Sequence, residues 1–308
     1  DMSLFVYTHP AGLQHDPGPG HPEAPIRLRR ILAALDGAEG LALERLEATA
    51  ADRAALSRAH SAAHVHNVLD QVPAKGLLPL DMDTWLNPHT GDAALRAAGA
   101  AVAAVDAVMA GATRRAFSAM RPPGHHAEPA LAMGFCFFNN VAVGAAQALE
   151  HHGLSRVAII DFDVHHGNGT EDIFAGDERV LICSSFQHPF YPGSGADTDL
   201  PNICNLPLPR LTNGASYREA VERVWLPRLE AFAPELIMIS AGFDGHVEDD
   251  MAHFNLVEAD YGWITRQIHD LAKRHARERV VSCLEGGYTL SALGRCVSTH
   301  VDELIGHA

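Results

Sequence analysis

The sequence predicts an α/β fold in which a central, mostly parallel sheet lies between two layers of helices. Short runs of β-branched and other apolar residues alternate along the chain with longer segments of helical composition. The runs RVAIIDF and ELIMIS are apolar almost throughout, which is typical of strands that are covered on both faces. No repeat, low-complexity segment or linker-like change of composition interrupts this pattern. We therefore expect residues 1–308 to form a single α/β/α domain.

The elements follow from local composition. The first strand is expected at Leu4–Tyr7, and the first helix at Ala24–Leu35, where Pro25 is tolerated because it lies in the first turn. A second helix is expected at Asp92–Met109, since this segment is rich in alanine and Gly111 closes it.

The rest of the chain continues the alternation. Strands are expected at the short apolar runs Ala116–Met120, Arg156–Phe162, Arg179–Ser184, Glu235–Ser240 and Arg279–Leu284. Helices are expected between and after them at Asn140–His152, Tyr217–Phe232, Glu258–His275 and Leu290–Ile305. Two stretches rich in glycine and proline, Pro10–Pro22 and Phe186–Pro209, are expected to be long surface loops.

The composition restricts the classes of partner. Lys and Arg number 23 against 38 Asp and Glu, which gives a formal charge of −15 and argues against a surface that binds nucleic acid. The same charge suits cationic partners such as lysine-rich tails or free amines. The most apolar run, Ala93–Ala110, carries Arg96 and Asp106, so no membrane span is expected. The five scattered cysteines lack CxxC spacing, which favours reduced thiols and a cytoplasmic protein.

Reactive residues follow four of the expected strands at once. They are RPPGHH at 121–126, DVHHGN at 163–168, Asp244 after ELIMISAGF, and EGGY at 285–288. In an open parallel sheet, ligands bind beyond the carboxyl ends of the strands. The four loops are therefore expected to meet at one functional site.

Asp163, His165 and Asp244 are candidate metal ligands. Asp163 and His165 are two positions apart, so they point to the same side of an extended segment. A catalytic Zn²⁺ site takes three such nitrogen and oxygen ligands and keeps one position open. A set without thiolate also suits Fe²⁺, Mn²⁺ or Co²⁺. The plain alternatives are a charged surface turn for the DVH segment and a helix N-cap for Asp244.

His125–His126 and Tyr288 are candidate catalytic groups. Two adjacent imidazoles repel each other when both are charged, so one should stay neutral and able to accept a proton. The alternative is a solvated pair, which is how we interpret His151–His152. Tyr288 follows two glycines that allow its phenol to approach a ligand, although a half-buried structural tyrosine is the commoner case.

In the order and wording of its motifs, the chain resembles the histone deacetylase family, which has the arginase–deacetylase fold. The resemblance extends through nearly the whole chain. Its segments are GHPE (20–23) with Arg27, Asp83-Thr84, RPPGHHAE (121–128), GFCFFNN (134–140), DFDVHHGNGT (161–170), YPGSG (191–195), AGFD (241–244) and EGGY (285–288). The wording RPPGHHAE and the asparagine at position 168 are similar to the class II branch and its bacterial homologues. The resemblance implies a three-layer fold with about eight strands in the central sheet.

The resemblance also implies a mechanism of amide hydrolysis. One Zn²⁺ per chain would be held by Asp163, His165 and Asp244. His126 would be the general base and then the general acid, and Asn168 would support it. His125, hydrogen-bonded to Asp161, would be the electrostatic partner. The phenol of Tyr288 would stabilise the oxyanion.

Further residues are implied less directly. Phe135 and Tyr191 match the aromatic walls of a substrate channel, with Gly134 beside them, and Met251 falls where polyamine-deacetylating relatives place an acidic residue. One K⁺ site would use Asp161, Asp163, His165 and Ser184 with a backbone oxygen near Ser185. A second would use backbone oxygens near Phe174, Asp177, Val180 and Asn202.

The substrate remains open between acyl-lysine, acetylpolyamine and small amides. Met251 favours an apolar acyl-lysine stem, whereas the adjacent Asp250 would favour a second ammonium group. A manganese ureohydrolase of the same fold would need extra carboxylates, which DFDVHHGN and SAGFDGHVEDD lack. A non-enzymatic acetyl-amide binder would not need the complete set of catalytic residues.

Overall fold

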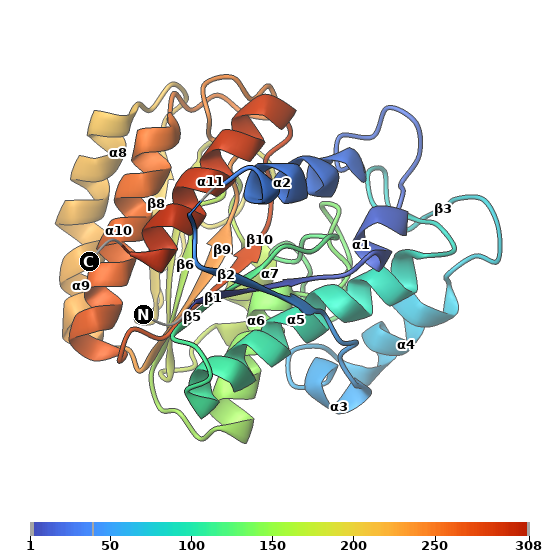
Figure 1. The fold of residues 1–308 in the computed structure, drawn as a ribbon, viewed down its shortest axis with the longest axis horizontal. Helices are drawn as coiled ribbons and strands as arrows, with labels where there is room; N and C mark the ends of the chain where they lie inside the picture. Colours follow the sequence, from blue (N-terminus) through green and yellow to red (C-terminus); the bar gives the residue numbers. More distant parts are fainter. Residues whose placement is uncertain (1–2, 39, 307–308) are drawn as a thin grey trace.

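The central sheet has eight strands in the order β2-β1-β5-β10-β9-β6-β7-β8, and every pair in it is parallel. The computed structural model describes residues 3–38 and 40–306 (Figure 1). The strands are β1 (Leu4–Thr8), β2 (Leu43–Glu47), β5 (Arg115–Ser118), β6 (Val157–Asp161), β7 (Val180–Gln187), β8 (Ile203–Leu208), β9 (Leu236–Ala241) and β10 (Val280–Leu284). The predicted α/β class with a parallel sheet is confirmed.

Helices cover both faces of the sheet (Figure 1). One layer comprises α2 (Ile26–Asp36), α8 (Gly214–Ala220), the π-helical turn η2 (Val221–Trp225), α9 (Leu226–Phe232), α10 (Glu258–His275) and α11 (Leu290–Ile305). The other comprises α3 (Arg53–Leu56), α4 (Ala62–Asp70), α5 (Thr90–Ala110), α6 (Asn140–Ala146) and the π-helical turn η1 (Gln147–His151). Short elements in the loops are α1 (Ala11–Gln14), α7 (Asn168–Phe174), β3 (Leu78–Pro79) and β4 (Trp85–Leu86).

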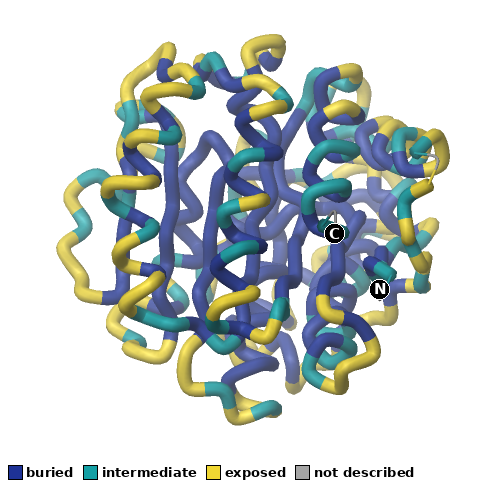
Figure 2. Tube along the Cα trace, turned by 60° about the vertical axis from the view of Figure 1, so that its left-hand side comes forward, coloured by how far each residue is buried: buried dark blue, intermediate teal, exposed yellow. Residues whose placement is uncertain are grey.

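The strands alternate their side chains between two hydrophobic cores. In β6, Ala158 and Ile160 pack into the core beneath α10 and α11, whereas Val157 and Ile159 pack into the core beneath α5 and α6. Figure 2 shows the buried strands between helices whose outer faces are exposed. This two-sided burial explains why β6 and its neighbour β9 are apolar without alternation.

Helix α5 is long and apolar enough to cross a membrane by length and composition alone. The charged residues Arg96 and Asp106 within this segment predict that it does not span a membrane. In the fold, α5 packs against α6 and β5, and 56% of its most apolar window is buried. Its alanines therefore serve close packing of a core helix against the sheet.

Several predicted boundaries were wrong. Pro10–Pro22 is not wholly a loop, because it contains α1, and Phe186–Pro209 contains the end of β7 and all of β8. The helix expected at Tyr217–Phe232 begins earlier, at Gly214, and includes η2. The two strands of the central sheet that were not predicted, β2 and β8, lie at its edges. Edge strands tolerate charged residues and proline, and β2 reads LERLE while β8 contains Pro207.

The sheet order brings the reactive loops together. Strands β5, β10, β9 and β6 are neighbours in the sheet and run parallel, so their carboxyl ends lie along one edge. The loops that follow these four strands carry the histidine pair, the EGGY segment, Asp244 and the DVH segment. Because these four strands are neighbours, the reactive residues of their loops lie close together at this edge of the sheet.

Candidate active site

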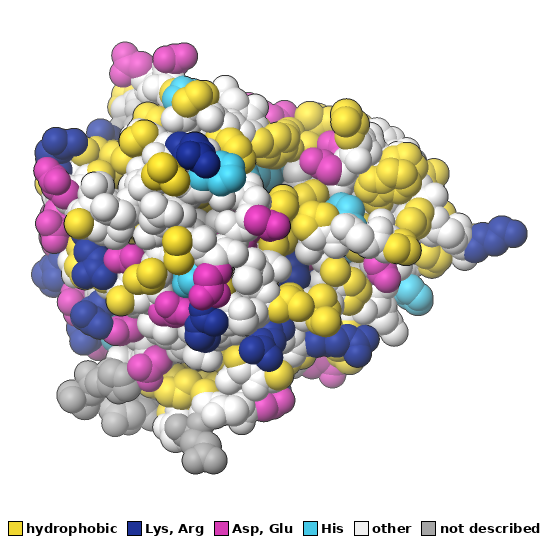
Figure 3. Space-filling view, turned by 90° about the horizontal axis from the view of Figure 1, so that it is seen from above, with side chains coloured by type: hydrophobic (Ala, Val, Ile, Leu, Met, Phe, Trp, Pro, Cys, Tyr) yellow, Lys and Arg dark blue, Asp and Glu magenta, His cyan; other side chains and the backbone are white. Residues whose placement is uncertain are grey.

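The four loops line a cavity of about 150 Å³ at the carboxyl edge of the sheet. Its walls are mainly aromatic and histidine side chains, and none of the described residues that line it is a lysine or arginine. The lining residues are Asp83, Pro123, His125, His126, Gly134, Phe135, Cys136, Asp163, His165, Phe190, Tyr191, Met251, Gly286 and Tyr288. Away from this cavity, acidic and basic side chains are interspersed on the face seen in Figure 3.

Asp163, His165 and Asp244 converge at the cavity. The Nδ1 atom of His165 lies 3.2 Å from Asp163 Oδ1 and 3.1 Å from Asp244 Oδ2, and all three residues are buried. Backbone amides hold the carboxylates, because Gly286 N donates to Asp163 Oδ2 at 2.9 Å and Val164 N donates to Asp244 Oδ1 at 3.1 Å. A Cβ at Gly286 would lie 2.2 Å from Asp244 Oδ2, so only glycine permits this close approach.

The electrostatics of this trio favour a bound cation. Burial and the neighbouring Asp163 raise the pKa of Asp244 to about 6. Burial opposes protonation of His165, but its hydrogen bonds to Asp163 and Asp244 raise its pKa to about 10. The buried carboxylates of Asp163 and Asp244 therefore attract positive charge. They do so at the place that His165 Nδ1 also faces. These donors fit Zn²⁺, and they fit Fe²⁺, Mn²⁺ or Co²⁺ as well.

Two other groups of potential ligands lie elsewhere in the described residues. His246, Glu258 and Cys296 form the first, but His246 Nδ1 accepts a hydrogen bond from the Glu248 amide at 3.1 Å. The imidazole proton then lies on Nε2, the atom that faces Glu258. In the second group, His152 Nε2 is 2.7 Å from Asp106 Oδ1 beside the exposed His151. Neither group lines the cavity described above.

The two adjacent histidines have different partners. His125 Nδ1 lies 2.8 Å from Asp161 Oδ2, and His126 Nδ1 lies 2.7 Å from Asn168 Oδ1. Burial opposes the charge on His125, but Asp161 and nearby carboxylates raise its pKa well above the ordinary value. Burial lowers the pKa of His126 well below its ordinary value, and the positive charge on His125 adds to this.

The phenol of Tyr288 reaches the cavity on a tightly held loop. The Arg27 guanidinium lies over its ring, 4.7 Å from the centroid, and donates to the Gly287 carbonyl at 2.6 Å. Asp249 Oδ2 accepts from the Tyr288 amide at 2.7 Å. Burial raises the pKa of the Tyr288 phenol well above its ordinary value, so the phenol stays protonated and can donate a hydrogen bond.

The residues expected in the channel all line the cavity: Gly134, Phe135, Tyr191 and Met251. Phe135 has a φ of 70°, in the left-handed region that a phenylalanine seldom adopts. Its ring lies 5.9 Å from that of Tyr288. At Gly134, a Cβ would lie 2.5 Å from His126 Cδ2, so the glycine lets the backbone pass against the histidine.

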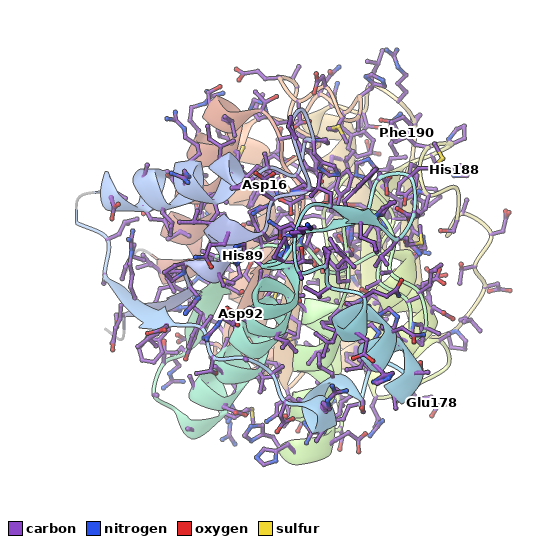
Figure 4. All side chains as sticks on the ribbon, turned by 90° about the vertical axis from the view of Figure 1, so that its right-hand side faces the viewer. Asp16, His89, Asp92, Glu178, His188 and Phe190 are labelled. Carbon is purple, nitrogen blue, oxygen red and sulfur yellow. The ribbon has the colours of Figure 1, made fainter. Side chains whose placement is uncertain are left out.

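Phe190 is a lining residue that sequence reasoning missed. Its ring is stacked on His165 at 5.7 Å with an interplanar angle of 24°. It lies with His188 on the segment that follows β7 (Figure 4). Its only sequence signal is its position before Tyr191, within a stretch that was expected to be surface loop.

Two acidic residues behind the cavity were also missed as functional positions. The carboxylate of Glu285 accepts from the amides of Gly124, at 2.8 Å, and His125, at 3.1 Å. Asp249 accepts from the Tyr288 amide. Glu285 belongs to the EGGY segment, which marked it as part of a motif, whereas Asp249 lies in an acidic run that carried no specific signal.

The residues of the first expected K⁺ site lie together. Asp161 on β6 pairs in register with Ser184 on β7, and Ser184 Oγ is buried with no hydrogen-bond partner among the described residues. The neighbouring Ser185 Oγ lies 2.8 Å from Tyr217 Oη. An orphaned buried hydroxyl beside a carboxylate fits an additional ligand such as a cation.

The residues of the second expected K⁺ site are arranged differently. The amide nitrogen Nδ2 of Asn202 donates to the carbonyl oxygens of Phe174 at 2.8 Å, Asp177 at 3.1 Å and Val180 at 3.2 Å. The side chain of Asn202 therefore occupies the point on which the three oxygens converge. These residues do not fit a bound cation in this arrangement.

The comparisons with known proteins agree with the motifs. The model of the histone deacetylase domain matches residues 21–304. The chain is 38% identical over 310 residues to a histone deacetylase-like amidohydrolase of Pseudomonas aeruginosa, covering 97% of this chain and 81% of that protein. It is 43% identical over 246 residues to type-2 histone deacetylase 2 of Dictyostelium discoideum, covering 72% of this chain but only 14% of that protein. Among solved structures, the HD domain of HDA15 superposes with a TM-score of 0.93 at 32% identity, over 99% of this chain and 90% of that one.

Proposed function

This chain belongs to the histone deacetylase family and is a hydrolase of amide bonds, and we propose that it removes acetyl or other acyl groups from lysine-like amines in a Zn²⁺-dependent reaction. The observation that carries the proposal is the convergence of Asp163, His165 and Asp244 beside two histidines and a phenol in one cavity. We also infer that residues 1–308 act as one catalytic domain.

Asp163, His165 and Asp244 would hold the metal. When bound, Zn²⁺ supplies Lewis acidity towards the amide carbonyl and lowers the pKa of water. The donors present fit this ion because they are two carboxylates and one imidazole around a point that attracts positive charge.

The chain's own groups carry the proton transfers. Asn168 holds Nδ1 of His126, so Nε2 is the nitrogen available to take a proton from the attacking water and to return it to the leaving amine. The low pKa of His126 keeps this base free, while Asp161 concentrates charge on His125. Tyr288 donates its phenolic proton in a hydrogen bond to the developing oxyanion, and Arg27 fixes the tyrosine ring.

The shape of the cavity supports an acylated amine on a slender stem. Phe135 and Tyr191 stand on its walls, and the cavity of about 150 Å³ suits an acyl group and methylenes better than a bulky ring. Met251, also on the wall, favours an apolar lysine stem. The alternative is an acetylpolyamine or small amide, for which the exposed Asp250 next to Met251 would bind a second ammonium group.

We further propose one K⁺ at the first monovalent-cation site, where Ser184 Oγ lacks a hydrogen-bond partner in the part of the chain that the structure describes. The second site is not proposed, because the Asn202 amide already uses its three carbonyl oxygens. All five cysteines are free and buried, which is compatible with the reducing cytoplasm that the sequence predicts.

The test is a panel of acylated lysine peptides, acetylated polyamines and small amides, assayed with metal-reconstituted protein. We expect turnover of at least one acyl-lysine peptide, and a loss of about 10²–10³-fold in kcat for Tyr288→Phe. Tyr191→Phe is the matched control, because it removes a phenol from the channel wall and not from the reacting carbonyl. Failure to hydrolyse any amide with metal bound would favour a non-enzymatic binder, and two Mn²⁺ per chain would favour a ureohydrolase.

A further inference from the structure

The side chain of Asn168 lies between Glu128 and His126. Its Oδ1 is 2.7 Å from His126 Nδ1, and its Nδ2 donates to Glu128 Oε1 at 2.9 Å. The same Nδ2 faces two weaker acceptors, the His126 carbonyl at 3.4 Å and the Met133 sulfur at 3.3 Å. Asn168 is buried, so these groups rather than bulk water surround its amide.

An asparagine amide beside a histidine permits two arrangements. With Oδ1 towards the ring, the amide accepts a hydrogen bond from Nδ1–H, and Nε2 is left without a proton. With the amide turned over, Nδ2 would donate to an unprotonated Nδ1, and the imidazole proton would lie on Nε2. Only the first arrangement leaves His126 able to act as a base on the cavity side.

The far side of the amide decides between them. An ionised carboxylate accepts hydrogen bonds and donates none, so Glu128 is satisfied only by the NH₂ end of Asn168. The turned-over amide would place Oδ1 against the carboxylate, the His126 carbonyl and the Met133 sulfur. That arrangement loses a charge-assisted hydrogen bond and sets oxygen against oxygen.

The backbone of Glu128 is itself fixed. Its amide donates to the Leu131 carbonyl at 2.9 Å, and its carbonyl oxygen lies 2.9 Å from His60 Nδ1. The carboxylate is therefore presented to Asn168 from a turn that is anchored on both sides. Glu128 does not line the cavity, so it acts at a distance from the substrate.

We propose that Glu128 is a positioning residue which, by fixing the orientation of the Asn168 amide, holds His126 in the Nδ1–H tautomer. The inference rests on the proposed function, in which His126 is the base. It assigns a role to the glutamate of the HHAE segment, and it explains how an amide, which has two possible orientations, is held in one of them behind the base.

The direct test is the tautomer of His126, read from long-range ¹H–¹⁵N couplings of ¹⁵N-histidine-labelled protein. His126→Ala identifies the signal. We expect the Nδ1–H form alone in the wild-type protein and a mixture of both tautomers in Glu128→Ala. The same variant should lose about 10-fold in kcat with KM within about twofold, and it should keep its metal. Glu178→Ala, at an exposed position between α7 and β7, is the matched control with unchanged tautomer and kcat.

Repeating the Glu128→Ala substitution in an Asn168→Asp variant distinguishes a positioning role of Glu128 from a general structural role. In Asn168→Asp, both side-chain oxygens accept hydrogen bonds, so no orientation has to be chosen. Glu128→Ala should then cause no further loss of kcat, and the double-mutant cycle should be non-additive. An equal loss in both backgrounds, or a single Nδ1–H tautomer in Glu128→Ala, would overturn the proposal.

The role of Glu128 can still be decided if Glu128→Ala does not fold or if the wild-type protein is inactive. If Glu128→Ala does not fold, Glu128→Gln keeps the size of the side chain but can also donate. A partial shift towards the Nε2–H tautomer is then expected, and an unchanged tautomer would contradict the proposal. If the wild-type protein hydrolyses no amide, the proposed function fails, but the tautomer measurement still decides the role of Glu128.

Discussion

The rings of His125 and His126 lie 4.1 Å apart, yet a buried carboxylate, Asp161, holds the first and a neutral amide, Asn168, holds the second. Two imidazolium ions at this separation repel each other, so the pair favours a single positive charge. Asp161 draws that charge to His125 and leaves His126 neutral. The difference between the two partners therefore gives the two adjacent histidines different charges, which supports the proposed roles of His125 as the electrostatic group and His126 as the base.

His126→Ala should abolish turnover and leave the metal bound. The residue is assigned to proton transfer, which contributes typically about 10²–10⁴-fold in rate, and it is not among the three expected ligands. The measurement is kcat together with the zinc content of the purified protein. Retained turnover would remove His126 from the mechanism, and lost metal would show that it also holds the ion.

Asp244→Ala should lower the affinity for Zn²⁺ sharply while the fold persists. Asp244 supplies one of the two carboxylates that face His165, and its removal leaves a single carboxylate there. Competition with a chromogenic chelator measures the affinity, and circular dichroism measures the fold. Asp250→Ala removes an exposed acid six positions along the chain and serves as the control, for which unchanged affinity is expected.

The sequence predicts best those strands that are buried on both faces. β6 and β9 lie inside the sheet, so nearly every residue must be apolar and the run is visible by itself. β2 pairs on one side only and leaves its glutamates and arginine exposed, so its sequence resembles a surface loop. Pairing with β1, which no local pattern specifies, makes it a strand.

The residues of the candidate site also divide into those that the local sequence reveals and those that depend on contacts between distant segments. Asp163 and His165 were identifiable as candidate ligands because a metal site needs particular residue types at a particular spacing. Phe190 and Asp249 act through contacts between distant parts of the chain, with His165 and with the Tyr288 amide. Any aromatic or acidic residue in a loop has the same local appearance, so only the folded structure distinguishes these two.

Potassium should stabilise the protein in one saturable phase, and Ser184→Ala should weaken that effect. The buried Ser184 Oγ has no hydrogen-bond partner within residues 3–38 and 40–306, and the ion would supply one. The measurement is Tm against KCl concentration at constant ionic strength, with choline chloride as the replacement salt. Ser282→Ala is a comparison variant, since that buried serine is already bonded to His300. Equal potassium dependence in wild type and Ser184→Ala would contradict the assignment.

A hydroxamate should inhibit turnover by chelating the metal at the floor of the cavity. Tyr191 and Phe135 line this cavity, and Gly134 beside them adds no side chain to its wall. The measurement is the dissociation constant of the hydroxamate, by isothermal titration calorimetry, for wild type and for Gly134→Leu, whose side chain would meet His126 and fill the channel. Binding that is unaffected by Gly134→Leu would mean that the hydroxamate binds the protein elsewhere.

The free energy of unfolding should fall as the pH falls below about 6.5, partly because of His300 on α11. Complete burial lowers the pKa of this imidazole to about 3. Thr265 Oγ1 donates to the Tyr261 carbonyl at 2.7 Å, so it accepts from His300 Nδ1–H, which leaves Nε2 to accept from Ser282 Oγ at 2.8 Å. Both nitrogens are satisfied in the neutral ring, and the buried imidazolium would be removed from the water that stabilises its charge.

The sign follows from proton binding. Below the ordinary histidine pKa of about 6.5 the unfolded chain binds a proton at residue 300, whereas the folded protein does not until about pH 3. Each unit of pH in this window should therefore cost about 1.4 kcal/mol of stability. His300→Gln should reduce the slope of unfolding free energy against pH by about this amount, measured by urea denaturation between about pH 7.5 and pH 5. Thr265→Val, which removes a hydrogen bond but keeps the histidine, should destabilise the protein with the slope unchanged. An unaltered slope in His300→Gln would show that His300 is protonated in the folded state.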